Sequence, residues 1–357
     1  MDKLTVSTTQ LQAMLAKAVR GAGNNKLIPM TSLVVIEAKD GNLTLTTTDK
    51  TNYLRVRTEL EGGDFYAVVN IELLAKLVAK MTSETTTLEL TDKYLNVIGN
   101  GKYQIDLPLD EDGEKIVLPN PISPFDEDEK PVGKVNSSTI ANILASIKSA
   151  LLTTMDYPWY TCYYVGENDT LATDTYTVGS YAKGFLNTPN LVSSEAMDLV
   201  GLLLDDIEIY IRDNKMLFWA KNGCVLATIP DGADRFSVED IRTLVEQDFD
   251  YSCKIAKTSM LNLLDRISLF VGVYDNGEIT LTFTKDGLEV TSKYANEKIK
   301  YAEEVNIGDF TCKTDINTLT AQIKSQLGGT IELQYGRDNA IKLIDGDVTS
   351  VVALLEE

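Results

Sequence analysis

The side chains that most often carry out catalysis are absent or scattered in this sequence. Histidine does not occur among the 357 residues, which removes Ser–His and Cys–His nucleophiles and the common zinc sites. The four cysteines, Cys162, Cys224, Cys253 and Cys312, are far apart and form no Cys-x-x-Cys pair. We therefore expect reduced thiols in the core. The sequence also lacks a Walker loop and a Gly-x-Gly-x-x-Gly motif that opens a helix.

Carboxylates are the one abundant reactive group. The chain has 53 acidic and 33 basic residues, for a formal net charge of −20. So many carboxylates supply endless candidate pairs for acid–base catalysis, and no single pair is informative. The acidic run FDEDEKP (125–131) lacks the Gly and the terminal Glu of a calcium loop, so a solvated linker is the better interpretation. We predict no enzyme, no metal and no cofactor. A paired-carboxylate enzyme stays an alternative that would need a deep acidic pocket.

Six segments with helical spacing are close to neutral in a chain that is otherwise strongly acidic. The segments are 10–20, 71–81, 137–152, 193–206, 257–270 and 315–327, each with apolar residues three and four positions apart. Together they hold seven acidic and eight basic residues, the latter being Lys17, Arg20, Lys76, Lys80, Lys148, Lys257, Arg266 and Lys324. Nearly all of the negative charge therefore lies in strands and turns. Scattered solvated lysines would explain this, but so would a surface making weak, sequence-independent contacts with DNA phosphates.

The six helical segments form three pairs, separated by alternating apolar and polar stretches that indicate strands. The pieces DGNLTLTTTD (40–49), ENDTLATDTY (167–176) and KDGLEVTSKY (285–294) are similar, and a strand–turn–strand–turn–strand block follows the second helix of each pair. We predict an α+β fold made of three tandem copies of a unit with two helices and an antiparallel sheet. The expected domains are 1–123, 132–246 and 251–357. A Pro-rich linker at 118–133 and an acidic one at 244–252 separate them. Plain domain duplication without a shared surface remains the simpler alternative.

The run NNKLIPMTSLVVIEAKDGNLTLTTTD (24–49) resembles the first domain of the bacterial-type DNA polymerase sliding clamps, the beta-subunit processivity factors. TLATDTY (170–176) is similar to the corresponding segment of their second domain, and SVVALLEE (350–357) to their apolar C-terminal strand. The resemblance implies a head-to-tail homodimeric ring of six domains, with helices lining a hole around duplex DNA. It implies a replicative polymerase and a clamp loader as partners, and no catalysis.

The resemblance also implies two protein-binding regions. A peptide-docking cleft between the second and third domains would use Trp159, Thr173, Asp174, Tyr176, Val178, Leu244, Val351, Leu354 and Leu355. The dimer interface would use Tyr103 and Ile105 in the first domain and Leu269 and Phe270 in the third. Part of this sequence departs from the family pattern. Thr175-Tyr176-Thr177 replaces a Gly-His-Arg-like run, Ser237 replaces a proline, and the chain ends in Glu356-Glu357. A divergent, phage-encoded clamp would explain these departures.

The N-terminus shows no basic-then-apolar signal, and no run of about 18 apolar residues occurs. We therefore expect a cytoplasmic protein of a bacterial or phage-infected cell, with no membrane partner. An acidic, β-rich structural or virion protein without a DNA role is the alternative from another class. It would explain the strands and the acidity, but not three helix pairs that are close to neutral while the rest of the chain is acidic.

Overall fold

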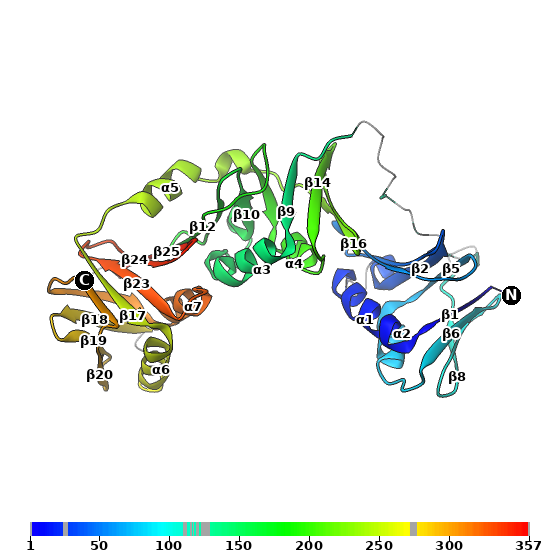
Figure 1. Ribbon diagram of the computed structural model, residues 1–357, viewed down its shortest axis with the longest axis horizontal. Helices are drawn as coiled ribbons and strands as arrows, with labels where there is room; N and C mark the ends of the chain where they lie inside the picture. The colour runs from blue at the N-terminus through cyan, green and yellow to red at the C-terminus, as the bar shows by residue number, and fades with distance from the viewer. Residues whose placement is uncertain are drawn as a thin grey trace. The chain divides into compact units, whose positions relative to one another are not determined.

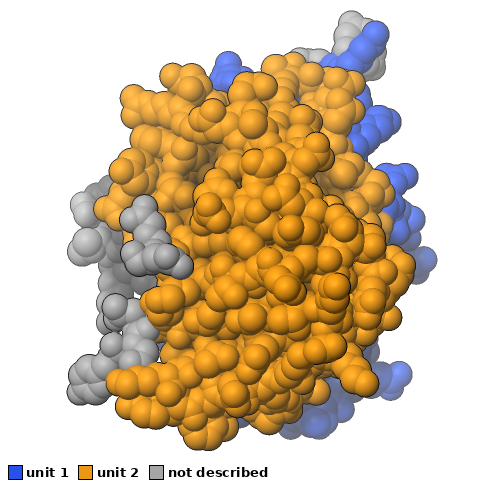
Figure 2. Space-filling model, turned by 90° about the vertical axis from the view of Figure 1, so that its left-hand side faces the viewer, with its two compact units in different colours: residues 1–137, 195–229 blue, residues 138–194, 230–357 orange. Residues whose placement is uncertain are grey.

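The structure is a computed structural model (Figure 1) that describes residues 2–23, 28–109, 113, 114, 116, 118, 121, 122, 129–271 and 277–355. These residues form antiparallel sheets with helices packed on them, which confirms the α+β class. By compactness the chain divides into two units, residues 1–137 with 195–229 and residues 138–194 with 230–357 (Figure 2). The middle third of the chain contributes to both units.

The first third of the chain runs strand, helix, four strands, helix, three strands. Its elements are β1 (Lys3–Ser7), α1 (Thr8–Ala18), β2 (Leu33–Lys39), β3 (Asn42–Thr48), β4 (Asn52–Glu59), β5 (Phe65–Asn70), α2 (Ile71–Val78), β6 (Thr85–Leu90), β7 (Tyr94–Ile98) and β8 (Lys102–Asp106). Two short 3-10 turns, η1 (Val19–Gly21) and η2 (Pro29–Ser32), follow α1.

The middle third repeats this order. It contains β9 (Gly133–Asn136), α3 (Ser137–Ser146), η3 (Lys148–Ala150), η4 (Pro158–Thr161), β10 (Cys162–Val165), β11 (Thr170–Thr173), β12 (Thr177–Tyr181), β13 (Asn190–Ser193), α4 (Ser194–Val200), β14 (Asp206–Arg212), β15 (Lys215–Ala220) and β16 (Gly223–Thr228).

The last third repeats it again with one strand added. It contains β17 (Tyr251–Ala256), α6 (Lys257–Ser268), β18 (Glu278–Thr284), β19 (Gly287–Thr291), β20 (Asn296–Ile299), β21 (Glu303–Asn306), β22 (Phe310–Asp315), α7 (Ile316–Ser325), β23 (Thr330–Tyr335), β24 (Ala340–Asp345) and β25 (Val348–Ala353). Before it, η5 (Ala233–Arg235) and α5 (Val238–Glu246) follow β16. The sequence analysis predicts neither α5 nor β21.

Strand pairing shows that the three copies share one topology. The order β1-β6-β7-β8 recurs as β9-β14-β15-β16 and as β17-β23-β24-β25. The order β5-β2-β3-β4 recurs as β13-β10-β11-β12 and as β22-β18-β19-β20. The predicted threefold repeat is therefore confirmed at the level of hydrogen-bonded strand order.

Successive copies join by pairing one edge strand from each. In the first unit β4 pairs with β16, so that Asn52 lies opposite Ala227. In the second unit β12 pairs with β25, so that Thr177 lies opposite Val352. The two junctions have the same register, because Asn52 and Thr177 each stand three residues after the aspartate that directly follows the preceding strand. Each junction merges two half-sheets into one continuous sheet.

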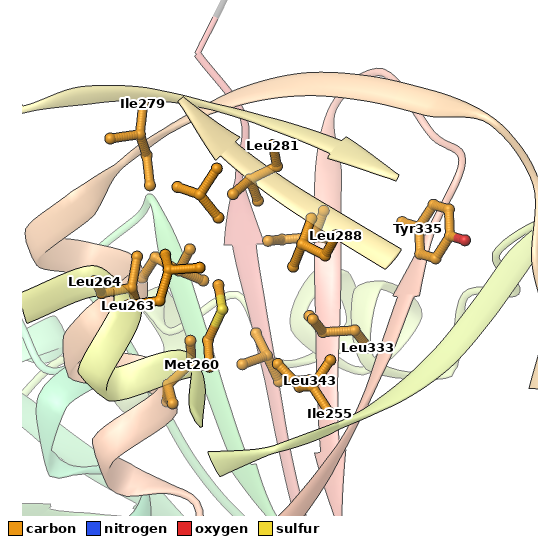
Figure 3. Close-up of a cluster of buried hydrophobic side chains, with 14 of the residues drawn as sticks. Ile255, Met260, Leu263, Leu264, Ile279, Leu281, Leu288, Leu333, Tyr335 and Leu343 are labelled. Carbon is orange, nitrogen blue, oxygen red and sulfur yellow. The ribbon is translucent and has the colours of Figure 1, made fainter. Parts of the chain in front are cut away.

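Helices pack on the sheets through apolar stripes. In the third copy Met260, Leu263 and Leu264 of α6 point toward Leu281 and Leu288 of the facing sheet (Figure 3), and all five side chains are buried. The spacing of three and four residues along α6 places these side chains on one face, so the opposite face stays in solvent.

Two helices begin at a residue whose side chain caps the first turn. The Asn70 side chain accepts a hydrogen bond from the Leu73 N–H at 2.9 Å, and that of Asp315 accepts from the Thr318 N–H at 2.7 Å. These bonds satisfy amides that the first turn of a helix leaves without partners. At α1 the N-cap is Ser7, and its side chain makes no such capping bond within the described residues.

The Thr-Asp pairs of the repeated pieces build the turn before each junction strand. Asp49 Oδ1 accepts hydrogen bonds from the N–H of Thr51 at 2.8 Å, from its hydroxyl at 2.8 Å and from Asn52 N–H at 2.7 Å. Asp174 Oδ1 likewise accepts from Tyr176 N–H, Thr177 N–H and the Thr177 hydroxyl. The residue after each aspartate has a positive φ, 92° at Lys50 and 81° at Thr175. The carboxylate thus stabilises a strained turn that delivers β4 or β12 to the next copy.

This turn generates a prediction. Asp49→Ala should leave the Thr51 and Asn52 amides without their acceptor, at a cost of about 1–3 kcal/mol. We expect hydrogen exchange at these amides to accelerate roughly tenfold to a hundredfold. Asp49→Asn keeps an acceptor oxygen and should change exchange less, and Asp64→Ala on an exposed loop should leave these amides unaffected. Unchanged protection in Asp49→Ala would show that the carboxylate does not hold the turn.

Candidate functional sites

The eight basic residues assigned to helical segments lie on helices or directly beyond their ends. Lys17 is on α1, Lys76 on α2, Lys257 and Arg266 on α6, and Lys324 on α7; Arg20 is in η1, Lys80 follows α2, and Lys148 begins η3. Their surroundings differ, and the differences decide which of them could contact a phosphate.

Two of these cations are paired with carboxylates. Lys76 Nζ bonds Glu72 one turn earlier on the exposed face of α2, and this hydrogen bond lowers the pKa of Glu72. Arg266 holds Glu297 of β20 with both ends of its guanidinium, and the Nε–Oε2 distance is 2.9 Å. That hydrogen bonding lowers the pKa of Glu297. Since Glu297 lies on the last strand of its sheet, Arg266 ties α6 to that strand.

Two others donate to carbonyls at helix ends. Lys257 Nζ donates to the Lys324 carbonyl at 2.9 Å and to the Gln326 carbonyl, directly beyond the end of α7. Lys17 Nζ donates to the carbonyl of Leu202, shortly after α4, at 3.3 Å. Cations at helix C-termini satisfy exposed carbonyls and oppose the helix dipole. Lys257 is therefore mainly a structural residue.

The remaining four, Arg20, Lys80, Lys148 and Lys324, are exposed. Among the residues that the structure describes, no ion pair is formed by Arg20, Lys80 or Lys324. These three are the best placed of the eight to contact a phosphate.

Four of the predicted cleft residues belong to an apolar cluster across the β12·β25 junction. Val178 and Val351 are buried in it, and Trp159 and Leu244 pack against it while partly exposed. Val178 and Val351 lie directly opposite each other in the strand pairing. Four of the nine predicted cleft residues are thus together in one apolar surface at the boundary of the second and third copies.

A row of aromatic rings borders this cluster. Tyr157, Trp159 and Tyr160 have ring centroids 5.8 to 6.1 Å apart, and Phe236 stacks on Tyr164 at 5.5 Å. The guanidinium of Arg235 lies 5.3 Å from the Trp159 ring. The Trp159 indole N–H is buried and has no hydrogen-bond partner among the described residues. The site therefore combines a large apolar surface with one unused donor, as peptide-binding pockets often do.

Three further cleft residues lie in the turn before β12. Thr173 and Asp174 form the hydrogen-bonded turn described above, so their side chains are engaged within the chain. Tyr176 follows them and is 74% exposed, and its carbonyl accepts from the Ala353 N–H at 2.9 Å. Of the three, only the ring of Tyr176 is available at the surface.

The last two predicted cleft residues lie elsewhere in the second unit. Leu354 packs against the core of the third copy, a different cluster from that of Trp159. Leu355 donates its N–H to the Lys313 carbonyl at 2.9 Å, and both leucines line a cavity of about 430 Å³ with Phe310 and Cys312. Glu356 and Glu357 lie outside the described residues.

No local sequence pattern predicts the residues whose hydrogen bonds hold α5 against the cluster. Arg242 on α5 forms two bonds with Asp169, Nε–Oδ2 at 2.8 Å and Nη2–Oδ1 at 3.0 Å, and these bonds raise the pKa of Arg242. The buried Lys342 of β24 donates to the carbonyls of Val245 at 3.2 Å and Gln247 at 2.6 Å, where α5 ends. Burial lowers the pKa of Lys342. Each partner is far away in sequence, so no local pattern marks these contacts.

The four residues expected at a dimer interface are located near the two end strands of the repeat. Tyr103 and Ile105 are on β8, the last strand of its sheet, with Tyr103 exposed and Ile105 buried. Leu269 and Phe270 directly follow α6 and are 81% and 51% exposed. Large apolar side chains with such exposure mark a surface that gains from being covered.

All four cysteines are buried and form no disulfide, and burial raises the pKa of Cys224 to about 11 and those of Cys253 and Cys312 to about 12. Within the described part of the chain, no three His, Cys, Asp or Glu residues are grouped as metal ligands. No helix in that same part is long and apolar enough to cross a membrane.

Residues 2–114 match the family described as DNA polymerase III beta subunit, N-terminal domain. The beta sliding clamp of Bacillus subtilis (strain 168) is 22% identical over 316 residues, which cover 81% of this chain and 80% of that protein. The crystal structure of the Bacillus subtilis clamp superposes with a TM-score of 0.83 at 16% identity, covering 99% of both chains. The beta subunit of Streptococcus pyogenes superposes with a TM-score of 0.83 at 13% identity, covering 100% of both chains.

The family match covers the first copy, whereas the sequence match to the Bacillus subtilis clamp covers 81% of the chain and the structural likeness covers all three copies. The threefold strand order, the paired helices and the sheets shared between copies thus have a common explanation. Over its whole length the chain has the fold of solved bacterial DNA polymerase sliding clamps, and its first third matches the family of their N-terminal domain.

Proposed function

We propose that this chain is a polymerase processivity factor that encircles duplex DNA as a head-to-tail homodimer. One observation carries the proposal: the two junctions between copies have the same register, and the two strands that would form a third such junction, β8 and β20, are end strands of their sheets. A second copy of the chain can pair both ends, which closes a ring and removes the exposed edges. The proposed domains are 1–123, 132–246 and 251–357.

The register of the third junction follows from the first two. The Ser292 N–H donates to the Ala295 carbonyl. In the other two copies the Asp49 N–H donates to the Asn52 carbonyl, and the Asp174 N–H to the Thr177 carbonyl. Ala295 is therefore the counterpart of Asn52 and Thr177. Their partners Ala227 and Val352 face buried residues of the next strand, Met216 and Ile341. In β8 the corresponding residue is Ile105, which faces the buried Leu95.

Ala295 should therefore lie opposite Ile105 of the second protomer, which places Asn296 opposite Gln104 and Glu297 opposite Tyr103. Arg266 holds Glu297 in position for this pairing. Leu269 and Phe270, three and four residues beyond Arg266, would cover the apolar side of the same junction.

Ring closure can be tested by charging its apolar side. The wild-type protein, once loaded, should stay on circular DNA and leave after linearisation. Leu269→Asp with Phe270→Asp should give monomers that are not retained, because two buried carboxylates would oppose the pairing. Leu204→Asp, at a leucine that is also exposed, should change neither property. Full dimerisation of the double variant in sedimentation would reject this interface.

The register has its own check. Cysteines at Asn296 and Gln104, both exposed, should cross-link two protomers on oxidation, since the native thiols are buried. Cysteines at Asn296 and Lys102 are two residues out of register and should cross-link far less. The opposite preference would show that the third junction differs from the first two.

Duplex DNA is the proposed occupant of the ring, held without sequence preference. The exposed cations on and beyond the helices supply weak phosphate contacts, and the acidic remainder of the chain repels DNA. Such a ring moves along the duplex while topology prevents its loss. This activity requires no catalytic residue and no cofactor, and a replicating cytoplasm is the proposed location.

The contacts with DNA should appear in the salt dependence. Arg20→Gln with Lys80→Gln should lower the slope of log affinity against log salt by about 0.9 for each phosphate that the variant no longer neutralises. Lys39→Gln with Lys285→Gln removes the same charge from exposed positions at turns between strands and serves as the control. Equal effects of the two pairs would mean that overall charge matters and that the helix surface does not. Adding Lys76→Gln to the first pair should extend the effect, because an exposed ion pair is worth little and can exchange partners.

The cluster around Trp159 is the proposed docking cleft for the polymerase and the clamp loader. A polymerase must hold the ring without filling its hole, and a short peptide that inserts apolar side chains meets this requirement. The partly exposed Trp159 and Leu244 and the exposed Tyr176 offer such a surface.

A single anchor should dominate this contact. Trp159→Ala should reduce polymerase stimulation at least tenfold, because truncating an aromatic anchor typically costs about 2 kcal/mol or more. Tyr294→Ala, an exposed aromatic of the third copy, is the control and should have no effect. Deleting residues 354–357 tests whether the chain end takes part. Full stimulation by Trp159→Ala, with dimerisation intact, would place docking elsewhere.

A further inference from the structure

The helices of the three copies differ in charge. In the first copy, α1, η1, α2 and the residues directly after α2 carry four basic residues and one acidic residue. In the third copy, α6, α7 and the residues directly beyond them carry three basic residues and one acidic residue. In the second copy, α3 and η3 carry Lys148 alone, whereas α4 and the residues that lead to β14 carry three acidic residues and no basic one.

The second copy presents acidic or neutral side chains where the other two present cations. Glu195 lies in the first turn of α4 and Asp205 lies between α4 and β14, and both are exposed. The exposed residues of α3 include Ser138, Ala141 and Ala145, none of which is charged. Neither α3 nor α4 contains a lysine or an arginine, so neither helix offers a positive charge to a phosphate.

This division matters because charge acts locally in salt solution. At physiological ionic strength the Debye length is about 8 Å, so a phosphate responds to the nearest helix and little to the net charge of the chain. In the first unit, Lys17 of α1 donates to the Leu202 carbonyl shortly after α4, so a basic helix and an acidic one are neighbours there. The three exposed helix cations without an ion pair among the described residues all belong to the first or the third copy; they are Arg20, Lys80 and Lys324.

We propose that the duplex contacts two basic sectors of the ring, one at each dimer junction, and that α4 of each protomer repels it. The inference rests on the proposed ring, in which the third copy of one protomer adjoins the first copy of the other. A basic sector consists of the helices of these two copies, so it draws Lys324 from one protomer and Arg20 and Lys80 from the other. Each sector is therefore complete only when its junction is closed. The second copies lie between the sectors and contribute the acidic α4 segments.

Cross-linking from equivalent positions of the three copies maps the contacts. Glu72, Glu195 and Asn317 are the second residues of α2, α4 and α7, and all three are exposed. A cysteine at each can carry a photoreactive group, since the native thiols are buried. With the ring loaded on nicked circular DNA, cross-links from Glu72→Cys and Asn317→Cys should exceed those from Glu195→Cys about tenfold, because surface potentials of several kT separate the sites. Glu195→Cys removes a repelling carboxylate, which biases the comparison against the proposal. Equal yields from the three sites would overturn it.

Charge reversal tests whether α4 faces the duplex. Glu195→Lys with Asp205→Asn should turn repulsion into contact and raise the slope of log affinity against log salt by about 0.9 for each phosphate newly contacted. Asparagine is chosen at position 205 because φ there is 61°, which asparagine tolerates. Glu61→Lys with Asp92→Asn makes the same charge change on exposed loops between strands and should alter the slope little. No change of slope in the α4 variant would reject the proposal, and so would equal changes in the two variants.

Retention on circular DNA separates this proposal from the proposed function. A loaded protein that does not stay on the circle would reject the ring, and the two sectors with it. A protein that is retained and cross-links equally from the three sites would leave encirclement intact and reject the sectors alone. Retention with strong cross-links from the first and third copies, and a steeper salt dependence in the α4 variant, is the result that we expect.

Discussion

Backbone hydrogen bonding between edge strands is the interaction on which the rest of this structure depends. A strand at the edge of a sheet exposes unpaired N–H and C=O groups and is a hazard unless something covers it. This chain pairs β4 with β16 and β12 with β25, so that each copy completes the sheet of its neighbour. The Thr-Asp turns matter because they deliver these strands in register. The apolar clusters around Val351 and Leu226 depend on this pairing too, because each forms where two half-sheets meet.

The basic side chains divide into those that hold elements of the fold in place and those that remain exposed. Arg266 holds the end strand β20, Arg242 and Lys342 hold α5, and Lys257 satisfies the end of α7. These cations hold the fold together, while the exposed Arg20, Lys80 and Lys324 remain for an external anion. With a net charge of −20 the chain as a whole repels a polyanion, which suits the proposed encirclement of DNA without tight binding.

The fold was largely predictable because its signals are local and repeated. Helical spacing and the recurring Thr-Asp pieces mark the three copies, and Val178, Val351, Trp159 and Leu244 do gather in one cluster. The prediction failed where contacts are distant. α5 was missed because its partners are distant residues of the second and third copies. Leu354 was expected beside Trp159, but it packs on the core of the third copy, a choice that depends on β25 leading the chain end past β22. Which helix cations were already paired also depends on contacts between elements.

The absence of histidine, together with buried thiols of raised pKa, has a consequence for how such a protein responds to its surroundings. Ordinary carboxyl groups titrate near pH 4, and lysine and tyrosine near pH 10. Histidine is the side chain whose ordinary pKa lies between these values, and it does not occur in this sequence. The charge that a histidine gains or loses near neutral pH is therefore missing from this chain. Ionic strength, through the thickness of the counterion atmosphere, is then the variable that tunes attraction to a polyanion. Ionic strength, rather than pH near neutrality, is therefore the expected control of this attraction.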